Sequence, residues 1–249
     1  MKRILVALFL GLVAGELRGQ EPEATSPESG QIWGNVVLDF PRGERLLLEL
    51  DFEPKAQVSG SETWRNIDVT PLVEHYPNRW IDLVGETTVG RTRQKNELST
   101  YEVTPRVGAR FHILSNLRTM QGGSRPLGRV SIANLVRFEW RNFWYSDGSE
   151  SHETRVRNRL ELKAGLNHRE LSSDKTLYLI ADFEFFVPLS DDVPERFASK
   201  RRTRVGLGYR RDDRLRFEVL FIRDGSRQTL EEDFDTAANI LNARLKMFF

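Results

Sequence analysis

Side chains able to perform acid–base or metal chemistry are sparse in this chain. Its four histidines are His75, His112, His152 and His168, none of them at metal-ligand spacing, and there is no cysteine. Neither an HExxH motif nor a GxSxG nucleophile elbow occurs. The sequence therefore predicts no metal site and no cofactor.

One serine–histidine combination could support acyl hydrolysis. His112 shares the polar face of an alternating segment with Arg110, and Ser131 lies on the polar face of the next segment. A serine hydroxyl beside an imidazole base is the basic unit of nucleophilic catalysis. The alternative is a histidine held in a charged network. The lack of any hydrolase motif around His112 or Ser131 favours that alternative, although it leaves the question of an enzyme open.

Charged residues that recur on one face of alternating segments are the more unusual feature. Unpaired arginines in a pore would select anions. Arginines matched by carboxylates would instead form salt bridges and fill the interior, and the number of acids favours this second interpretation. The candidate members of such a network are Arg106, Arg110, Arg137, Arg141, Arg155, Arg157, Arg159, Arg202, Arg204, Glu102, Glu139, Glu161, Asp182 and Glu184.

Strict alternation of apolar and polar residues predicts the elements that carry these side chains. In residues 101–113, for example, Tyr101, Val103 and Val107 share one face, while Glu102 and Arg106 share the other. Successive side chains leave a strand on opposite faces, so this period of two indicates β-strands. The candidate strands are 31–40, 45–53, 63–76, 80–91, 98–114, 128–142, 153–166, 176–187, 201–210, 214–223 and 239–249.

Composition excludes several classes of protein. The 249 residues are 29% charged and 39% hydrophobic, and the formal net charge is +1. Nothing beyond the N-terminus approaches the roughly 18 uninterrupted apolar residues of a membrane helix. The charge balance argues against nucleic acid as a partner, and the content of Leu, Val, Ile and Phe argues against disorder.

The N-terminus has the layout of a secretory signal peptide. Lys2 and Arg3 precede a short apolar run from Ile4 to Ala14, and small residues follow. We predict a signal peptide over residues 1–20 and a flexible lead-in, rich in Pro, Glu and Ser, over residues 21–30. A single β domain then occupies residues 31–249.

Alternation alone would also suit a sandwich of two antiparallel sheets. Three further features favour a closed barrel in a membrane. Many candidate strands reach the 9–11 residues that a tilted membrane strand needs, and their polar face is strongly ionic. Aromatic residues such as Trp80, Trp140 and Trp144 lie near strand ends, as in interfacial belts.

The final strand resembles that of bacterial outer-membrane β-barrels. Leu245, Met247 and Phe249 share its apolar face, and the sequence stops on Phe249. In those proteins such an ending is read by the barrel assembly machinery, so these three residues are the predicted assembly signal. The chain also looks like a family of uncharacterised outer-membrane barrels that begin with an Ile-Trp-Gly strand, here Ile32, Trp33 and Gly34.

These observations predict an all-β protein, an antiparallel transmembrane β-barrel in the outer membrane of a bacterium. Single-chain bacterial barrels have an even number of strands, so the eleven candidates predict ten or twelve strands, with twelve favoured. The expected partners are outer-membrane lipids, lipopolysaccharide and the barrel assembly machinery; the oligomeric state stays open.

The expected function is a small pore, or a structural or interaction protein with a charged, narrow or plugged lumen. Two alternatives remain at this point: an outer-membrane lipid hydrolase using His112, and a soluble periplasmic lipid-binding β-protein.

Overall fold

Eleven β-strands make up the part of the chain that the computed structural model describes, namely residues 29–60, 64–94, 99–120, 123–189, 201–226 and 235–249. No helix in these residues is long and apolar enough to cross a membrane. The predicted signal peptide (1–20) and the lead-in as far as residue 28 lie outside them, and the first strand begins at Ser29. The strands are β1 (Ser29–Arg42), β2 (Leu46–Ser59), β3 (Trp64–His75), β4 (Ile81–Gln94), β5 (Ser99–Met120), β6 (Gly123–Tyr145), β7 (Glu150–Gly165), β8 (Thr176–Pro188), β9 (Arg201–Arg210), β10 (Leu215–Ser226) and β11 (Asp235–Phe248).

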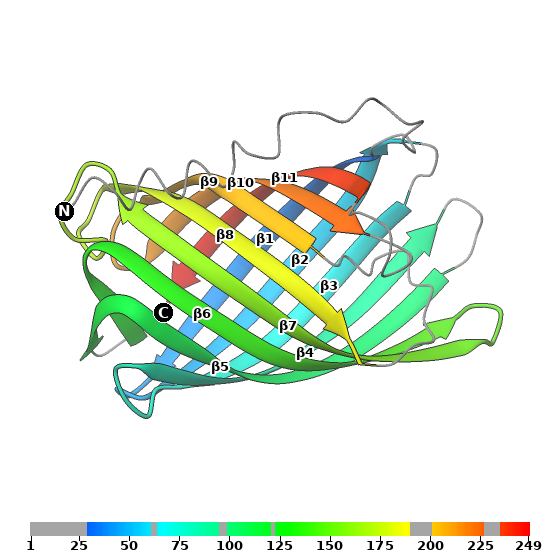
Figure 1. Ribbon diagram of the computed structural model, residues 1–249, viewed down its shortest axis with the longest axis horizontal. Coiled ribbons are helices and arrows are strands. Elements are labelled where there is room, and N and C mark those ends of the chain that lie inside the picture. Colours follow the sequence, from blue (N-terminus) through cyan, green and yellow to red (C-terminus); the bar gives the residue numbers. More distant parts are fainter. Residues whose placement is uncertain (1–28, 61–63, 95–98, 121–122, 190–200, 227–234) are drawn as a thin grey trace.

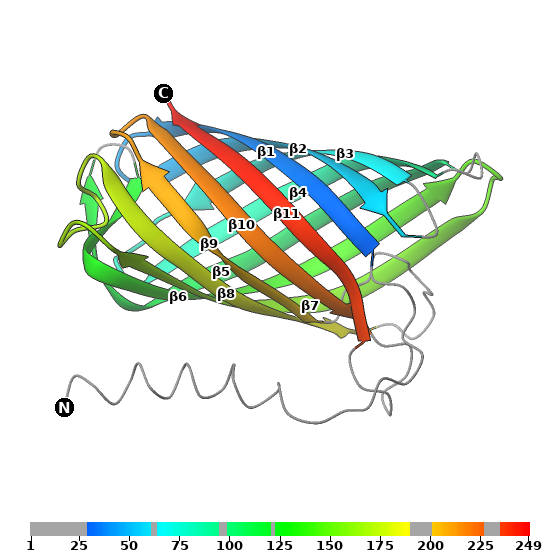
Figure 2. The ribbon, with the colours of Figure 1, turned by 90° about the horizontal axis from the view of Figure 1, so that it is seen from above.

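The strands form one closed barrel in sequence order (Figures 1 and 2). Each strand pairs antiparallel with the next, and the seam between β1 and β11 is parallel, with eleven residues in register from Ser29↔Ala238 to Asp39↔Phe248. Closure leaves no free sheet edge. The predicted fold class, an all-β barrel built mainly from antiparallel strands, is confirmed.

The number of strands needs correction. The structure has eleven strands rather than the favoured twelve, and they correspond to the eleven segments that the alternation predicted. The expectation of an even number assumed that the first and last strands pair antiparallel. Because β1 and β11 pair in parallel, an odd number closes the sheet. The same parity places Ser29 and Phe249 at opposite ends of the barrel.

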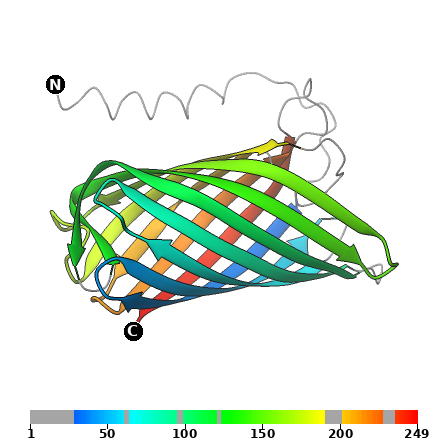
Figure 3. The same cartoon turned by 90° about the horizontal axis from the view of Figure 1, so that it is seen from below.

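The two ends of the barrel differ in their connections. The end that carries Phe249, here called the C-terminal rim, holds the turns after β1, β3, β5, β7 and β9. The β5 and β6 strands bend at this rim, and the β6–β7 hairpin projects at the opposite end (Figure 3). The opposite rim holds the start of β1 and the tight turn between β6 and β7. In that turn Asp147 accepts hydrogen bonds from the backbone and hydroxyl of Ser149, which lower the pKa of Asp147, and Gly148 takes a positive φ of 87°.

Alternation along each strand separates an apolar outer face from a polar inner face. On β5, Val107 is 53% exposed, whereas the side chain of its neighbour Arg106 is only 12% exposed and makes ion pairs inside the barrel. Large apolar residues on the outer face stay exposed along the strands, including Leu50 and Phe221. The predicted assignment of the two faces is confirmed for these residues.

Glycine on the inner face makes room for one large side chain. A Cβ atom at Gly208 on β9 would collide with the ring of Tyr178 on β8. The ring is buried over this gap, and its hydroxyl donates a hydrogen bond of 2.8 Å to Glu218 on β10. The absence of a side chain at Gly208 therefore relieves crowding inside the barrel.

The parallel seam can be tested by cross-linking. Val36 and Leu245 are Cα partners across β1 and β11 and share the outer face. Since the chain has no native cysteine, the double variant Val36→Cys/Leu245→Cys should form a disulfide under mild oxidation, because paired strands bring Cα atoms within about 4.4–6.8 Å. Gel mobility before and after reduction reports the cross-link.

The matched control is Val36→Cys/Phe217→Cys. Phe217 is the partner of Leu245 on β10 and lies one strand further from β1, so this pair should stay reduced. Cross-linking of the control but not of the test pair would contradict the seam between β1 and β11.

Candidate functional site

A continuous ion-pair network fills the middle of the barrel. It joins seven arginines to seven carboxylates through contacts of at most 4.0 Å, and it runs along the inner faces of β4 to β10. With seven charges of each sign the network is neutral. Its members, here called the girdle, are Arg106, Arg137, Arg141, Arg155, Arg157, Arg202, Arg204, Glu86, Glu102, Glu139, Glu153, Asp182, Glu184 and Asp224.

Glu139 on β6 is one centre of the girdle. Its carboxylate is completely buried. It is contacted by Arg155 at 2.6 Å, Arg106 at 3.1 Å and Arg157 at 3.4 Å, from strands on both sides of β6. Burying a carboxylate is costly unless charge and hydrogen bonds compensate it. The three arginines supply that compensation and tie β5, β6 and β7 together on the inside.

Glu184 on β8 is the second centre and is also completely buried. Arg157 donates to it from β7, with Nη2 to Oε2 at 2.8 Å. Arg204 from β9 approaches at 3.3 Å and Arg137 from β6 at 3.7 Å. Since Arg137 also contacts Glu86 on β4 at 2.6 Å, the girdle reaches from β8 to β4 across the interior.

Two aromatic side chains extend the girdle towards β1. The Phe186 ring lies under the guanidinium groups of Arg155 and Arg157, at 4.8 and 4.9 Å from its centroid. The Trp33 ring on β1 receives Arg202 from β9 at 5.0 Å and Lys55 from β2 at 4.7 Å. Cation–π contacts of this kind strengthen when the groups are removed from water. Trp33 thus connects the girdle to the inner faces of β1 and β2.

The charged side chains on the inner face of β1–β4, here called the acidic wall, are mostly carboxylates. Among the described inner-face residues of β1–β4, Lys55 is the one cation, and the carboxylates are Asp39, Glu49, Asp51, Glu53, Asp68, Glu74, Asp82 and Glu86. Cations from strands further round the barrel reach several of them. Lys246 on β11 contacts Asp39 at 3.0 Å and Glu49 at 2.8 Å. The interior therefore pairs an acidic wall with an arginine-rich wall on β5–β9.

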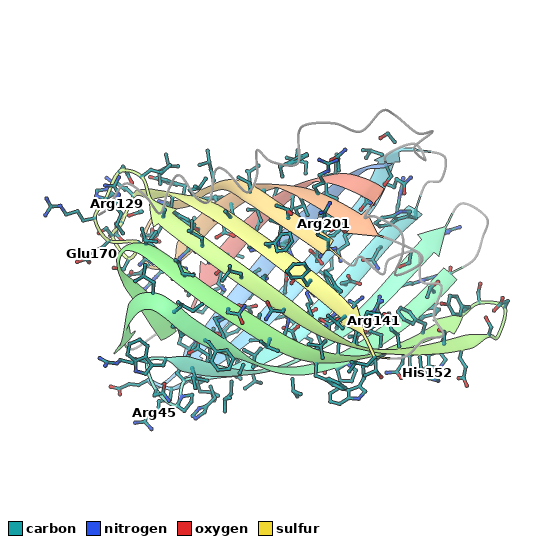
Figure 4. All side chains as sticks on the ribbon, in the orientation of Figure 1. Arg45, Arg129, Arg141, His152, Glu170 and Arg201 are labelled. Carbon is teal, nitrogen blue, oxygen red and sulfur yellow. The ribbon has the colours of Figure 1, made fainter. Side chains whose placement is uncertain are left out.

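Towards the C-terminal rim the interior is more open. The side chains of Glu161, Lys163 and Arg244 are 26%, 32% and 28% exposed, whereas Glu139 and Glu184 in the girdle have none of their surface exposed. Figure 4 places the labelled Arg129 and Glu170 at this rim, with Arg141 and His152 nearer the other end. The inner side chains on this side of the girdle are therefore partly accessible to solvent, whereas the two buried centres of the girdle are not.

His112 belongs to a separate polar cluster near the C-terminal rim. Its Nε2 lies 2.6 Å from Asp82 Oδ2, and Arg110 contacts both Glu74 and Asp82. Tyr76 completes the cluster by donating its hydroxyl hydrogen bond to Glu74.

The structure does not bring the predicted Ser131–His112 pair into contact. In the described part of the chain no hydrogen bond joins them, and His112 Nδ1 is buried without a partner. On β6 the register places Ala133, not Ser131, opposite His112, and Ser131 faces Lys163 on β7. The serine–histidine unit expected from the sequence is therefore not assembled in this structure.

The fourteen sequence-predicted interior residues divide into two groups. Eleven belong to the girdle, and Arg110, Arg159 and Glu161 lie outside it. Sequence reasoning missed Glu86, Glu153 and Asp224 as girdle members, and Trp33 and Phe186 as its aromatic contacts. The alternation of β4 could have identified Glu86, since it shares a face with Asp82.

The predicted assembly-signal residues lie on the seam. Leu245 and Met247 are the register partners of Val36 and Leu38 on β1. The backbone N–H of Phe249 donates to the carbonyl of Asp39, and its ring stacks on Phe40 with centroids 5.2 Å apart. Phe249 remains 71% exposed, so its ring is available on the outer surface of the rim.

Nowhere in the described residues do three or more histidine or carboxylate side chains gather in an arrangement that could hold a metal ion.

Comparison with protein families matches residues 30–229 to the family described as "Protein of unknown function (DUF2490)". The chain belongs to this family. The match runs from β1 through β10 and so includes the whole girdle of this DUF2490 barrel. A search of curated proteins found no match.

We expect the girdle to contribute to the free energy of unfolding of this DUF2490 barrel. Glu184→Gln should leave its surrounding arginines without a buried counter-charge and cost about 3–5 kcal/mol in the free energy of unfolding. Glu161→Gln is the control, because its partially exposed pair with Lys163 should be worth only about 0–1 kcal/mol. Urea unfolding of the folded barrel measures both. Equal losses for the two variants would show that the girdle does not stabilise the barrel.

Proposed function

We propose that this protein is an outer-membrane β-barrel whose interior is closed at mid-height by the girdle, and that it acts as a structural or interaction protein with little or no steady conduction. The single observation that carries the closed interior is the burial of Glu139 and Glu184 under arginines from β5, β6, β7 and β9. Barrels of about 8 strands are filled by side chains and those of 16–18 strands leave a channel. For a barrel of intermediate size, side-chain pairing decides the outcome.

Several features support a location in a membrane. Hydrocarbon offers the backbone no partners, so a sheet in a bilayer must close, and this sheet is closed. Its outer face exposes apolar residues at mid-strand. Outward aromatics lie near both rims: Trp80, Tyr209, Phe217 and Phe249 at the C-terminal rim, and Tyr101, Trp140 and Trp144 at the other. Such belts suit the two membrane interfaces. Lipids and lipopolysaccharide would then cover the outer face, and the barrel assembly machinery would insert it.

Val107→Arg tests the membrane location. In a bilayer, an arginine at the middle of the outer face should destabilise the barrel by about 2–4 kcal/mol. Val58→Arg is the control, because Val58 is equally exposed but lies near the end of β2, where the cost should be about 0–1 kcal/mol. Unfolding from lipid vesicles gives both values. Two small and equal effects would argue for a water-exposed outer face.

Planar-bilayer recording tests the closed interior. The unmodified protein should show no large steady current. Arg157→Ser/Glu184→Ser removes one charge of each sign from the girdle, leaves the net charge unchanged and creates space, so it should raise the conductance. Lys163→Ser/Glu161→Ser removes the same charges outside the girdle and should not. Heat-modifiable gel mobility checks that each variant is folded.

A large, stable current through the unmodified protein would overturn the closed-interior proposal and indicate a porin-type channel. Closed behaviour in all three proteins would leave the girdle without a role in blocking the interior.

A further inference from the structure

Arg159 on β7 forms no ion pair with any residue that the structure describes. In the described interior no carboxylate lies within 4.0 Å of its guanidinium, and its Nε is buried without a hydrogen bond. It stands next to the girdle on the same strand face as Arg157 and Glu161. Because the girdle is neutral, Arg159 adds a positive charge that the girdle does not balance.

The carboxylates nearest to Arg159 are already engaged. Its register partner on β8 is Glu184, whose two oxygens receive Arg157 and are approached by Arg204 and Arg137. Asp182 accepts from Arg204 at 2.7 Å. Glu161 pairs with Lys163 at 3.2 Å. Asp182 and Glu184 cannot turn to Arg159 without leaving a buried arginine uncompensated, and Glu161 is held by Lys163.

Arg159 can be reached from the C-terminal rim. The two inner-face residues that follow it towards that rim, Glu161 and Lys163, are 26% and 32% exposed. Arg110 and Arg244 on β5 and β11 are exposed to a similar extent, at 25% and 28%. A small solute entering from this rim would therefore meet Arg159 at the boundary between the open interior and the closed girdle.

We propose that Arg159 is an anion-binding residue that takes a small oxyanion, a carboxylate or a phosphate, from the C-terminal side of the barrel. A guanidinium presents its N–H groups in the planar fork that matches two oxygens of such an anion. A bound anion would supply the missing negative charge and accept hydrogen bonds at the floor of the open part. This site does not depend on whether the barrel conducts.

Chloride-35 NMR of the folded protein in non-ionic detergent tests the proposal with chloride itself as the probe. Exchange of chloride with a protein site broadens its resonance. The unmodified protein should broaden it, and added inorganic phosphate or acetate at constant ionic strength should suppress the broadening. Suppression by both competitors indicates a general oxyanion site, and suppression by phosphate alone narrows the ligand to phosphate.

Arg159→Gln should lose most of the competitor-sensitive broadening. Arg45→Gln removes the same charge from the exposed turn between β1 and β2 at the same rim and should keep it. Arg159→Lys keeps the positive charge and should retain part of the competitor-sensitive broadening. This variant therefore distinguishes loss of the anion site from misfolding of the barrel. The proposal is overturned if no broadening is suppressed in the unmodified protein, or if Arg159→Gln and Arg45→Gln behave alike. Neither result would change the conductance expected from the girdle.

Discussion

The burial of Glu139 and Glu184 is the constraint on which the interior of this protein depends. A carboxylate removed from water is stable only with charge and hydrogen bonds around it. A barrel wall can offer these only from neighbouring strands or across the lumen. The arginines that surround the two glutamates come from four strands, so the pairing of charges and the register of strands must agree. A slip of one residue would turn the arginines of one strand outwards and remove part of the compensation of these buried acids.

Closure of the sheet imposes a second constraint. A parallel seam between β1 and β11 requires an odd number of strands, and it brings Asn242 on β11 beside Asn35 on β1, with a hydrogen bond of 2.7 Å between their amides. Lys246 reaches past β1 to Glu49 on β2. The seam is therefore held by the backbone ladder and also by polar contacts that cross it on the inside.

The alternation of apolar and polar residues made the strands predictable. The contacts between strands could not be predicted, because they depend on pairing between distant parts of the sequence. The period of two assigned eleven segments and their inner and outer faces, because alternation is a property of each strand by itself. The strand count failed because parity depends on how the first and last strands meet, which no local pattern contains. For the same reason the sequence placed Arg157 and Glu184 inside but could not say that they touch. His112 and Ser131 also share the inner surface, but the register sets them apart.

The distribution of charge inside the barrel explains why Arg159 has no carboxylate in contact among the described residues. The acidic wall on β1–β4 is compensated partly from afar, by Lys246 on β11 and Arg110 on β5. The arginine-rich wall is compensated mainly by carboxylates on its own strands, together with Glu86 on β4 and Asp224 on β10. Arg159 lies on the arginine-rich wall, where each adjacent carboxylate already serves another cation. The acids across the lumen cannot replace a contact partner, since Coulomb attraction weakens with distance and with exposure to solvent on the side of the C-terminal rim. Arg159 therefore lacks a carboxylate in direct contact within the described interior, and this is the position that a small oxyanion would fill under our proposal.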